Sequence, residues 1–304
     1  MTRERYAALA GLLPQGRVLL EESMARHTSF RVGGPADALA YPGNAAEVAA
    51  VVLWCAQRDI PWIVIGNGTN LLVRDGGIRG VVLKLSERMH GIAVERNRLT
   101  AQAGASLPAT ARAALAASLT GLEFASGIPG SVGGAVVMNA GAYGGAMEQV
   151  VRRVEVMAPD GDVRWLDGPE MRFGYRHSRC AEERLTVLTA EMELEAGDTD
   201  LIGARMSELA AQRREKQPLN LPSAGSTFKR PEGHFAGKLI EEAGMKGERV
   251  GGAQVSELHA GFIVNLGGAT ATDILSLMER VAGTVERRTG VRMEPEVRIL
   301  GEDL

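Results

Sequence analysis

The chain has few cysteines, few aromatic side chains and no excess of basic residues. Its 304 residues include two cysteines, Cys55 and Cys180, without a CxxC pair or a signal-peptide pattern. This predicts a cytoplasmic protein without a disulfide framework. Aromatic residues make up only 4% of the chain, so few rings are present to stack on bases. The net charge is −3, whereas a general nucleic-acid-binding protein is expected to carry an excess of basic residues.

Long apolar runs and metal-ligand patterns are also missing. No stretch approaches the ~20 apolar residues that a membrane-spanning helix needs, so we expect no association with a membrane. The five histidines are scattered and none has HxxxH or HExxH spacing, so we expect no metal site. Nothing in the sequence indicates an obligate protein partner.

Glycine, in contrast, is clustered. The run GIPGSVGGA at residues 127–135 continues into NAGAYGG at residues 139–145. Because glycine has no Cβ atom, its backbone amides can approach a ligand closely and can turn with positive φ. The run therefore predicts a loop that binds the pyrophosphate of a nucleotide cofactor.

A second glycine loop lies in the same half of the chain. The sequence GNGTN at residues 66–70 lies between apolar runs at residues 63–65 and 71–73. Such a polar turn places hydrogen-bond donors at a strand end, where α/β proteins commonly bind ligands. It matches neither the Rossmann fingerprint nor the GxxxxGK[ST] phosphate loop. Each loop alone is compatible with a simple chain turn, but two of them favour nucleotide binding.

The apolar periodicity predicts a chain of mixed helices and strands. Helices are predicted near residues 44–58, 106–118, 201–216, 237–243 and 272–289, and strands near residues 62–65, 81–85, 151–157, 185–194, 262–265 and 296–300. Asn44 and Glu47 give the first helix a start similar to a capping box, and apolar residues from Ile274 to Val285 share one face of the last. A shift toward charged residues predicts a domain boundary near residue 200.

Four short polar segments carry side chains suited to proton transfer or to binding of an oxyanion. They centre on Arg31, Arg176, Ser226 and Glu296. Together they offer a hydroxyl as a proton donor, arginines for an oxyanion and a carboxylate beside a cation. Local sequence alone favours a capping or turn role for Ser226 and a solvated surface for the charged residues.

These motifs together resemble those of the UDP-N-acetylenolpyruvoylglucosamine reductase family, also called the UDP-N-acetylmuramate dehydrogenases. The matching motifs, in family order, are TSFRVGG at residues 28–34, GNGTN at 66–70, GIPGSVGG at 127–134, NAGAYG at 139–144, YR at 175–176, AGSTFK at 224–229 and EPEVR at 294–298. The resemblance covers nearly the whole chain. The length of 304 residues is similar to that of the shorter members, which lack an inserted loop that brings a tyrosine over the substrate.

The resemblance implies an α+β fold. Its parts are a two-part FAD-binding domain of the vanillyl-alcohol-oxidase (PCMH) type and a C-terminal α/β substrate-binding domain. We expect the first FAD-binding subdomain at residues 1–88, the second at residues 89–200, completed by a C-terminal strand at residues 294–304, and the substrate domain at residues 201–293. Some relatives hold the flavin covalently through a histidine in the first glycine loop. This loop contains none, so FAD should bind without a covalent bond.

The resemblance also implies the reaction. NADPH would reduce FAD, and the flavin N5 would pass hydride to C3 of UDP-GlcNAc-enolpyruvate, giving UDP-N-acetylmuramate for peptidoglycan synthesis. Catalytic roles would fall to Arg176 and Glu296, which stabilise the developing charge, and to Ser226, which protonates C2.

The binding residues that the resemblance implies form two sets. The expected cofactor-binding residues are Arg31, Gly66, Asn67, Gly68, Thr69, Asn70, Leu71, Ser126, Gly127, Ile128, Gly130, Ser131, Gly133, Gly134, Asn139, Ala140 and Gly141. The expected substrate-binding residues are Tyr175, Lys216, Lys229, Arg230 and Arg298.

Two other readings explain part of the sequence. An FAD-linked oxidase or dehydrogenase of the same flavin-domain superfamily, acting on an alcohol or hydroxy acid, would explain the glycine loops but not Ser226, Arg176 and Glu296 together. A nucleotide-sensing or scaffold protein that had lost catalysis would predict damaged catalytic positions, and all three are intact.

Overall fold

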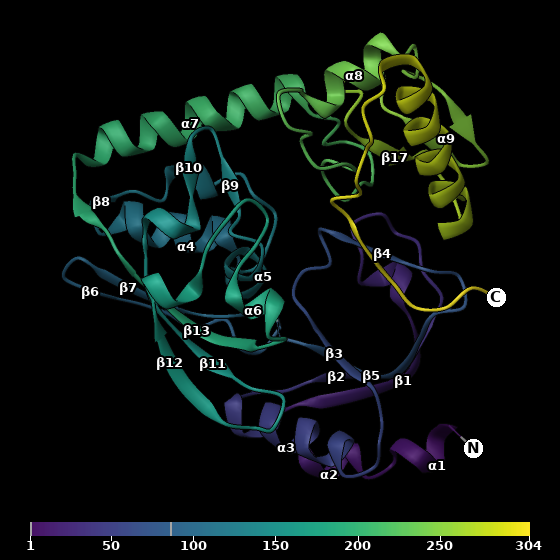
Figure 1. The fold of residues 1–304 in the computed structure, drawn as a ribbon. Helices are drawn as coiled ribbons and strands as arrows, with labels where there is room; N and C mark the ends of the chain where they lie inside the picture. Colours follow the sequence, from purple (N-terminus) through teal and green to yellow (C-terminus); the bar gives the residue numbers. More distant parts are fainter. Residues whose placement is uncertain (1, 86) are drawn as a thin grey trace. The chain divides into compact units, whose positions relative to one another are not determined.

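A computed structural model describes residues 2–85 and 87–304 of the chain, which divide into two compact units (Figure 1). The first unit contains the described residues of Met1–Leu20, Ala38–Asn67 and Gly80–Arg213. The second contains Glu21–Asp37, Gly68–Arg79 and Arg214–Leu304.

Helices and strands alternate along the chain, which confirms the mixed character predicted from the sequence. The α-helices are α1 (Thr2–Tyr6), α2 (Leu9–Leu12), α3 (Ala45–Ala56), α4 (Leu107–Ala116), α5 (Val132–Val137), α6 (Arg179–Glu182), α7 (Thr199–Lys216), α8 (Ala236–Glu242) and α9 (Ala271–Thr289). The strands are β1 (Arg17–Ser23), β2 (Pro35–Tyr41), β3 (Trp62–Ile65), β4 (Leu71–Val73), β5 (Ile78–Lys84), β6 (Ile92–Glu95), β7 (Arg98–Gln102), β8 (Leu119–Thr120), β9 (Gly141–Ala142), β10 (Gly145–Ala146), β11 (Val151–Met157), β12 (Val163–Asp167), β13 (Thr186–Glu193), β14 (Glu195–Ala196), β15 (Arg249–Val250), β16 (Ala253–Val255), β17 (Ile263–Asn265) and β18 (Arg298–Leu300).

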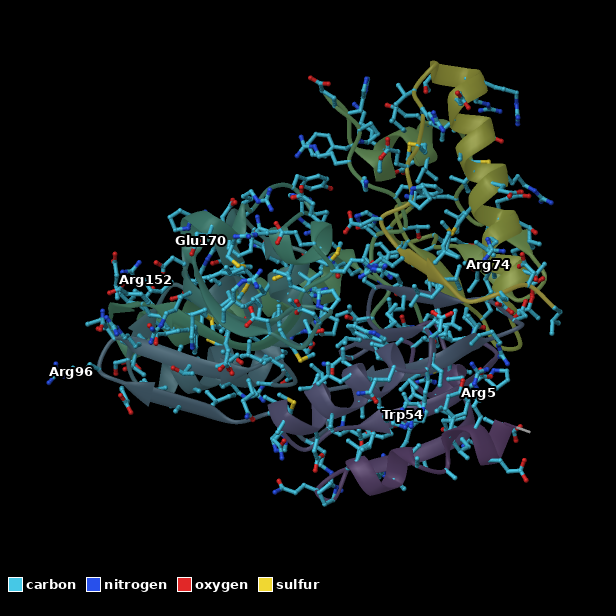
Figure 2. The ribbon with its side chains drawn as sticks, turned by 60° about the horizontal axis from the view of Figure 1, so that its bottom comes forward. Arg5, Trp54, Arg74, Arg96, Arg152 and Glu170 are labelled. Atoms are coloured by element: carbon cyan, nitrogen blue, oxygen red, sulfur yellow. The ribbon has the colours of Figure 1, made fainter. Side chains whose placement is uncertain are left out.

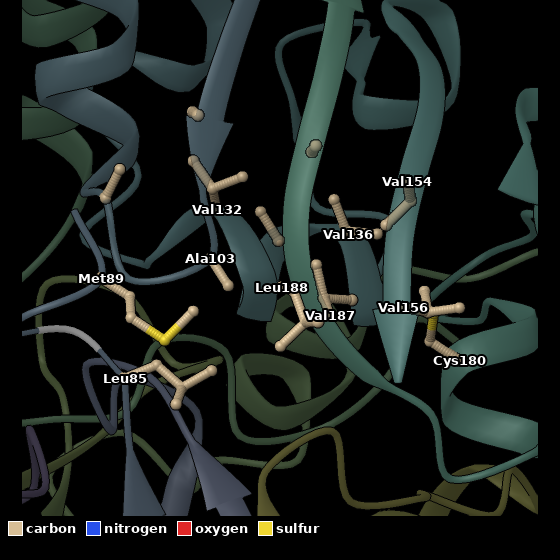
Figure 3. Packing of buried hydrophobic residues seen from close by; sticks show 14 of the residues in the cluster. Leu85, Met89, Ala103, Val132, Val136, Val154, Val156, Cys180, Val187 and Leu188 are labelled. Carbon is tan, nitrogen blue, oxygen red and sulfur yellow. The ribbon is translucent and has the colours of Figure 1, made fainter. Parts of the chain in front are cut away.

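The first unit is built on a five-stranded antiparallel sheet in the order β12-β11-β13-β7-β6. Helix α5 packs against β13 and β7. Figure 3 shows Val132 and Val136 of α5 close to Leu188 of β13, and all three are fully buried. Burial of three aliphatic side chains contributes about 1.5–3 kcal/mol each, so this contact fixes the chain that leads into α5.

A second sheet has the order β1-β2-β5-β3, and its last strand, β3, precedes the first glycine loop. In the first unit, β3 and β5 pair in parallel, with Trp62 opposite Val81. Helix α3 carries the predicted start, because the Asn44 side chain accepts a hydrogen bond from the Glu47 amide over 2.9 Å. The Glu47 carboxylate binds the amides of Gln15 and Gly43, so the reciprocal half of a capping box is replaced by these contacts.

The second unit contains the antiparallel sheet β15-β16-β17 and the long helix α9. The predicted apolar face of α9 is confirmed, because Ile274, Leu277, Val281 and Val285 are at most 1% exposed. Thr270 caps the start of α9 and Gly290 ends it with φ of 72°. Glycine tolerates this left-handed conformation, so the helix stops there.

The final strand, β18, pairs in parallel with β4, with Arg298 opposite Leu71. This pairing joins two short strands far apart in the sequence, which local patterns do not reveal. That residues 294–304 complete the second FAD-binding subdomain stays a prediction. The expected subdomain boundaries at residues 88 and 200 stay predictions.

The surface of the described residues is strongly charged. In Figure 2, Arg96 and Arg152 point away from the sheets of the first unit, and both are exposed. Among the described residues, none of the helices combines the length and the apolar character that crossing a membrane requires.

Candidate functional site

The two glycine loops predicted from the sequence meet within the first unit. Gly66 follows β3, and a Cβ atom added to Gly66 would lie 2.1 Å from the Oγ atom of Ser131. The side-chain amide of Asn67 donates to the backbone oxygen of Pro129 over 3.4 Å. Only glycine fits at position 66 without displacing Ser131. Residues 66 and 67 and the loop at residues 127–131 therefore form one backbone-lined surface, here called the glycine cradle.

The glycine cradle presents backbone amides that have no acceptor among the described residues. Across residues 2–85 and 87–304, the amides of Gly66, Asn67, Gly127, Gly130 and Ser131 donate no hydrogen bond. None of these residues is exposed, and Ser131 is 2% exposed. Backbone amides without an acceptor among the described residues are available to an acceptor supplied by a ligand. The oxygens of a phosphate group fit this donor set.

Helix α5 holds the second loop in place. The Ser131 hydroxyl accepts from the Gly134 amide over 3.4 Å and begins the helix. The Gly133 amide donates to the backbone oxygen of Ala103 over 2.8 Å, and a Cβ atom on Gly133 would lie 2.9 Å from that of Ala103. The missing side chain at Gly133 therefore allows α5 to approach the residue that follows β7. The sequence reading did not predict α5, because glycines oppose helix formation.

Arg213 of α7 lies against the glycine cradle and was not selected from the sequence. Its Cδ atom is 3.2 Å and its Nη1 atom 3.6 Å from the position that a Cβ atom on Gly127 would take. The described residues offer it no hydrogen-bond acceptor and no ion pair. Burial lowers the pKa of the Arg213 guanidinium, and the phenol of Tyr143 acts against this shift. Its position in the charged run RREK gave no local signal that separates it from surface arginines.

Arg176 lies in a tight turn that a buried asparagine holds. The turn pairs Gly174 with His177 through two backbone hydrogen bonds, and Arg176 has φ of 54°. The Asn139 side-chain amide donates to the Gly174 oxygen over 3.1 Å and to the Glu148 carboxylate over 3.0 Å. Its oxygen accepts from the Glu148 amide over 3.0 Å.

The contacts of Asn139 bear on its expected role. Asn139 is 6% exposed, and both its donor and its acceptor groups are occupied by protein. That Asn139 contacts the cofactor stays a prediction, and in the structure its side chain holds the turn that carries Arg176. A second anchor of the same segment is the Ser178 hydroxyl, which donates to the Val137 oxygen over 2.7 Å.

In the second unit, Ser226 and Glu296 belong to neighbouring segments. Residues 226–229, here called the serine segment, lie between the segment that contains Gly261 and the segment that contains Glu296. The Thr227 amide donates to the Gly261 oxygen over 2.8 Å, and the Thr227 oxygen accepts from the Glu296 amide over 2.8 Å. Phe228 and Pro295 form a further backbone bridge. The predicted proton donor and the predicted carboxylate are therefore carried on segments joined by backbone hydrogen bonds.

A half-buried histidine supports the serine segment from the other side. The His259 Nδ1 atom accepts from the Gly261 amide over 3.0 Å, and the Gly261 oxygen is the acceptor for Thr227. The His259 ring also meets the Phe262 ring edge to face at 5.0 Å. Burial lowers the pKa of His259, which favours the neutral ring that this hydrogen bond needs.

The predicted substrate-binding cations differ in their surroundings. Lys229 pairs with Glu294 over 3.2 Å, and the Arg230 guanidinium lies 3.9 Å from the centre of the Phe235 ring. Arg298 and Lys216 are exposed, at β18 and at the end of α7. The predicted Tyr175 is 60% exposed, with the Arg176 guanidinium 5.5 Å from its ring centre.

The remaining predicted cofactor residues lie in two places. In the second unit, a Cβ atom on Gly68 would lie 1.9 Å from the His27 oxygen, and the Gly68 oxygen accepts from the Ser29 amide. Arg31 is exposed in the turn that follows, and Asn70 donates to the Glu296 oxygen over 3.2 Å. Thr69 and Leu71 flank Asn70, and Leu71 begins β4. In the first unit, Ile128 belongs to the glycine cradle, and the other predicted residues of that unit are Ser126, Gly134, Ala140 and Gly141.

Comparison with known proteins gives two matches to protein families. Residues 36–167 match the family described as FAD binding domain. Residues 217–300 match the family described as UDP-N-acetylenolpyruvoylglucosamine reductase, C-terminal domain.

Individual proteins are similar over nearly the whole chain. A protein of Caldanaerobacter subterraneus subsp. tengcongensis, named UDP-N-acetylenolpyruvoylglucosamine reductase, is 51% identical over 97% of each chain. The protein of the same name from Pediococcus pentosaceus is 50% identical over 97% of this chain and 98% of its own. The crystal structure of UDP-N-acetylenolpyruvylglucosamine reductase from Thermus caldophilus superposes with a TM-score of 0.80, at 35% identity, over 94% of this chain and 99% of that one.

Proposed function

This chain belongs to the UDP-N-acetylenolpyruvoylglucosamine reductase family, and from that premise we propose that it is an FAD-dependent, NADPH-consuming enzyme of peptidoglycan precursor synthesis. It reduces UDP-GlcNAc-enolpyruvate to UDP-N-acetylmuramate. The observation that carries the proposal is the likeness at about half of all positions over 97% of both chains. The fold is that of the family, an FAD-binding part followed by the family's C-terminal domain.

The glycine cradle fits FAD. Its unpaired amides need an acceptor, and the absence of Cβ atoms at Gly66 and Gly127 lets a diphosphate approach the backbone. We assign the diphosphate to Gly66, Asn67, Gly127, Gly130 and Ser131. When bound, FAD supplies hydride transfer from NADPH to the vinyl carbon C3 of the substrate.

The other cofactor contacts are proposed on the same motifs. In the second unit these are Arg31, Gly68, Thr69, Asn70 and Leu71. Of these, Gly68 is the position where a side chain would overlap backbone, because a Cβ atom there would meet the His27 oxygen. A non-covalent site agrees with the absence of histidine from residues 66–70.

Ser226 is proposed as the proton donor. Saturation of C3 leaves negative charge at C2 and in the substrate carboxylate, so C2 must receive a proton. A serine hydroxyl is a weak acid, but an enolate carbon is a strong base, and a well-placed hydroxyl is then sufficient. The hydrogen bonds of Thr227 fix the backbone from which the hydroxyl projects, which supports this role.

Arg176 and Glu296 are proposed to stabilise the charge that develops on the carboxylate. Preformed charges act best where negative charge increases toward the transition state. The turn at residues 174–177 and the bond from Glu296 to Thr227 give each group a fixed backbone.

Cations are proposed to meet the anionic groups of the substrate. Lys229 and Arg298, with Arg230, Lys216 and Tyr175 as further contacts, would bind its diphosphate and carboxylate. Arginine presents a planar pair of donors that suits such oxyanions. A chain with a net charge of −3 needs such local cations for a dianionic substrate.

The cellular setting is proposed as the cytoplasm, with small molecules as the only obligatory partners. Both cysteines, Cys55 and Cys180, are buried free thiols. Burial raises the pKa of Cys55 to about 11 and that of Cys180 to about 12, so neither is a reactive thiolate. The division into FAD-binding subdomains at residues 1–88 and 89–200 and a substrate domain at residues 201–293 is part of the same proposal.

The test is anaerobic stopped-flow spectroscopy of the purified protein. NADPH should bleach the visible absorbance of the oxidised flavin. Addition of UDP-GlcNAc-enolpyruvate should restore it, with UDP-N-acetylmuramate as the product. Recovery with an alcohol-derived carbonyl acceptor instead, or bleaching without recovery, would reject the reductase in favour of another flavoenzyme.

A further inference from the structure

Arg213 combines a positive charge with a place among unpaired donors. Its Cδ atom lies 3.2 Å from the position that a Cβ atom on Gly127 would take, and the amides of Gly127, Gly130 and Ser131 have no acceptor in the described chain. A guanidinium and a set of N–H dipoles repel one another unless an anion lies between them. The arrangement is therefore incomplete without a negatively charged ligand.

The described residues offer no such charge. Among them, the Tyr143 phenol is the group that favours the charged form of Arg213 electrostatically. A phenol is a hydrogen-bonding group and not a carboxylate, and no carboxylate of the described residues pairs with Arg213. Arginines that serve structure alone are usually paired when they are withdrawn from solvent.

We infer that Arg213 binds the diphosphate of a nucleotide at the glycine cradle, with FAD as the favoured source. This rests on the proposed function, because the cradle is assigned to FAD there. A fork of parallel N–H groups fits two phosphate oxygens, and glycine at position 127 leaves room for the aliphatic part of the side chain to cross the loop. Arg213 thereby adds the full positive charge that backbone amides lack.

The test compares nucleotide binding by four variants. Arg213→Gln removes the charge and Arg213→Lys keeps it without the fork. Gly127→Ala presses a methyl group on the Arg213 Cδ atom while leaving its charge. Arg112→Gln is the matched control, because Arg112 is an exposed arginine of α4 in the same unit. Circular dichroism and thermal unfolding of each apoprotein establish that it folds.

Three titrations separate the ligand sources. Apoprotein is titrated with FAD and with riboflavin, which has no phosphate, by the change in flavin fluorescence. Holoenzyme is titrated with UDP-N-acetylglucosamine by the change in flavin absorbance. We expect Arg213→Gln to weaken FAD about 10- to 100-fold, with Arg213→Lys between it and the natural protein. Riboflavin and the Arg112→Gln control should not change.

Each outcome decides the inference. Weaker FAD binding by Arg213→Gln supports the inference and identifies FAD as the source of the diphosphate. Unchanged FAD affinity together with weaker binding of UDP-N-acetylglucosamine indicates that Arg213 binds the diphosphate of the substrate instead. Unchanged binding of both nucleotides, or equal loss of FAD and riboflavin, overturns it. A natural protein that binds no FAD at all would reject the proposed function, whereas normal turnover with an unchanged FAD affinity in Arg213→Gln rejects only this inference.

Discussion

Removal of the Asn139 side chain should impair the use of the substrate while sparing the cofactor. The side chain forms three hydrogen bonds that connect the Gly174 oxygen, the Glu148 carboxylate and the Glu148 amide. Glu148 is exposed, so its carboxylate can turn to water. The Gly174 oxygen and the Glu148 amide are then the groups that lose a partner.

The size of the effect follows from those two groups. A net hydrogen bond contributes about 0.5–1.5 kcal/mol, so two of them amount to roughly 1–3 kcal/mol of support for the turn at residues 174–177. Each 1.4 kcal/mol changes a population about tenfold. If Arg176 acts on the substrate carboxylate, reoxidation of the reduced flavin by UDP-GlcNAc-enolpyruvate should slow about 5- to 100-fold.

The choice of substitution matters because Asn139 has φ of 42°. Alanine would add backbone strain of about 1 kcal/mol, whereas glycine adopts this conformation freely. Asn139→Gly therefore removes the side chain alone, and Asn139→Asp keeps its shape but places a carboxylate beside the Glu148 carboxylate and the Gly174 oxygen. Asn97→Gly, at an exposed turn, is the control.

Anaerobic stopped-flow measures both half-reactions, and an FAD titration of the apoprotein measures cofactor affinity. Reoxidation should be slow in Asn139→Gly and Asn139→Asp, with FAD affinity and reduction by NADPH close to those of the natural protein. A loss of FAD affinity with normal reoxidation would refute it and restore the cofactor contact expected from the sequence. Unchanged rates in both half-reactions would show that the turn holds without Asn139.

Three further predictions address other parts of the site. Ser226→Ala should leave reduction by NADPH unchanged and slow reoxidation by the substrate about 10²- to 10⁴-fold in stopped-flow, and normal reoxidation would remove Ser226 as the acid. Gly66→Ala should weaken FAD at least about tenfold, because its methyl group overlaps the Ser131 hydroxyl, whereas the control Gly11→Ala, with open space around it, should not. His259 has a lowered pKa because of burial, so its contribution to the free energy of unfolding is complete above the ordinary pKa of about 6.5 and is lost as pH falls through the lower folded value. Denaturant unfolding should therefore show a steeper loss of stability below about pH 6.5 in the natural protein than in His259→Asn, and parallel curves would contradict the role of the neutral ring.

The elements that the sequence predicted well depend on local features. Helix α9 has a full apolar stripe, a threonine cap and a terminal glycine, all within one short stretch of chain. Helix α5 has a serine cap but no terminal glycine, and Gly133 and Gly134 within it oppose helix formation. What fixes it is the contact of Gly133 with Ala103, which lies far away in the sequence. The pairing of β18 with β4 escaped prediction for the same reason.

In the candidate site, too, the residues with a local sequence signal were predicted and those defined by distant contacts were not. The glycine loops were identified because glycine and a preceding strand are visible in the sequence, and the structure brings their first-unit residues together. Arg213 was missed because its importance comes from what it lies against and from the lack of an acceptor among the described residues, not from its neighbours in the chain. Asn139 was assigned by its motif, but its contacts are set by Gly174 and Glu148.

The backbone of the second unit also explains why the proposed acid and the proposed carboxylate occur in motifs so far apart. Thr227 donates to Gly261 and accepts from Glu296, so a single residue joins the two motifs. The Thr227 hydroxyl accepts from the Ile263 amide over 3.1 Å and is fully enclosed, with 1% exposure of the residue. Any displacement of Ser226 along the chain would have to break bonds on both sides of Thr227. The neighbouring threonine thus gives a weakly acidic hydroxyl the fixed position that proton donation requires.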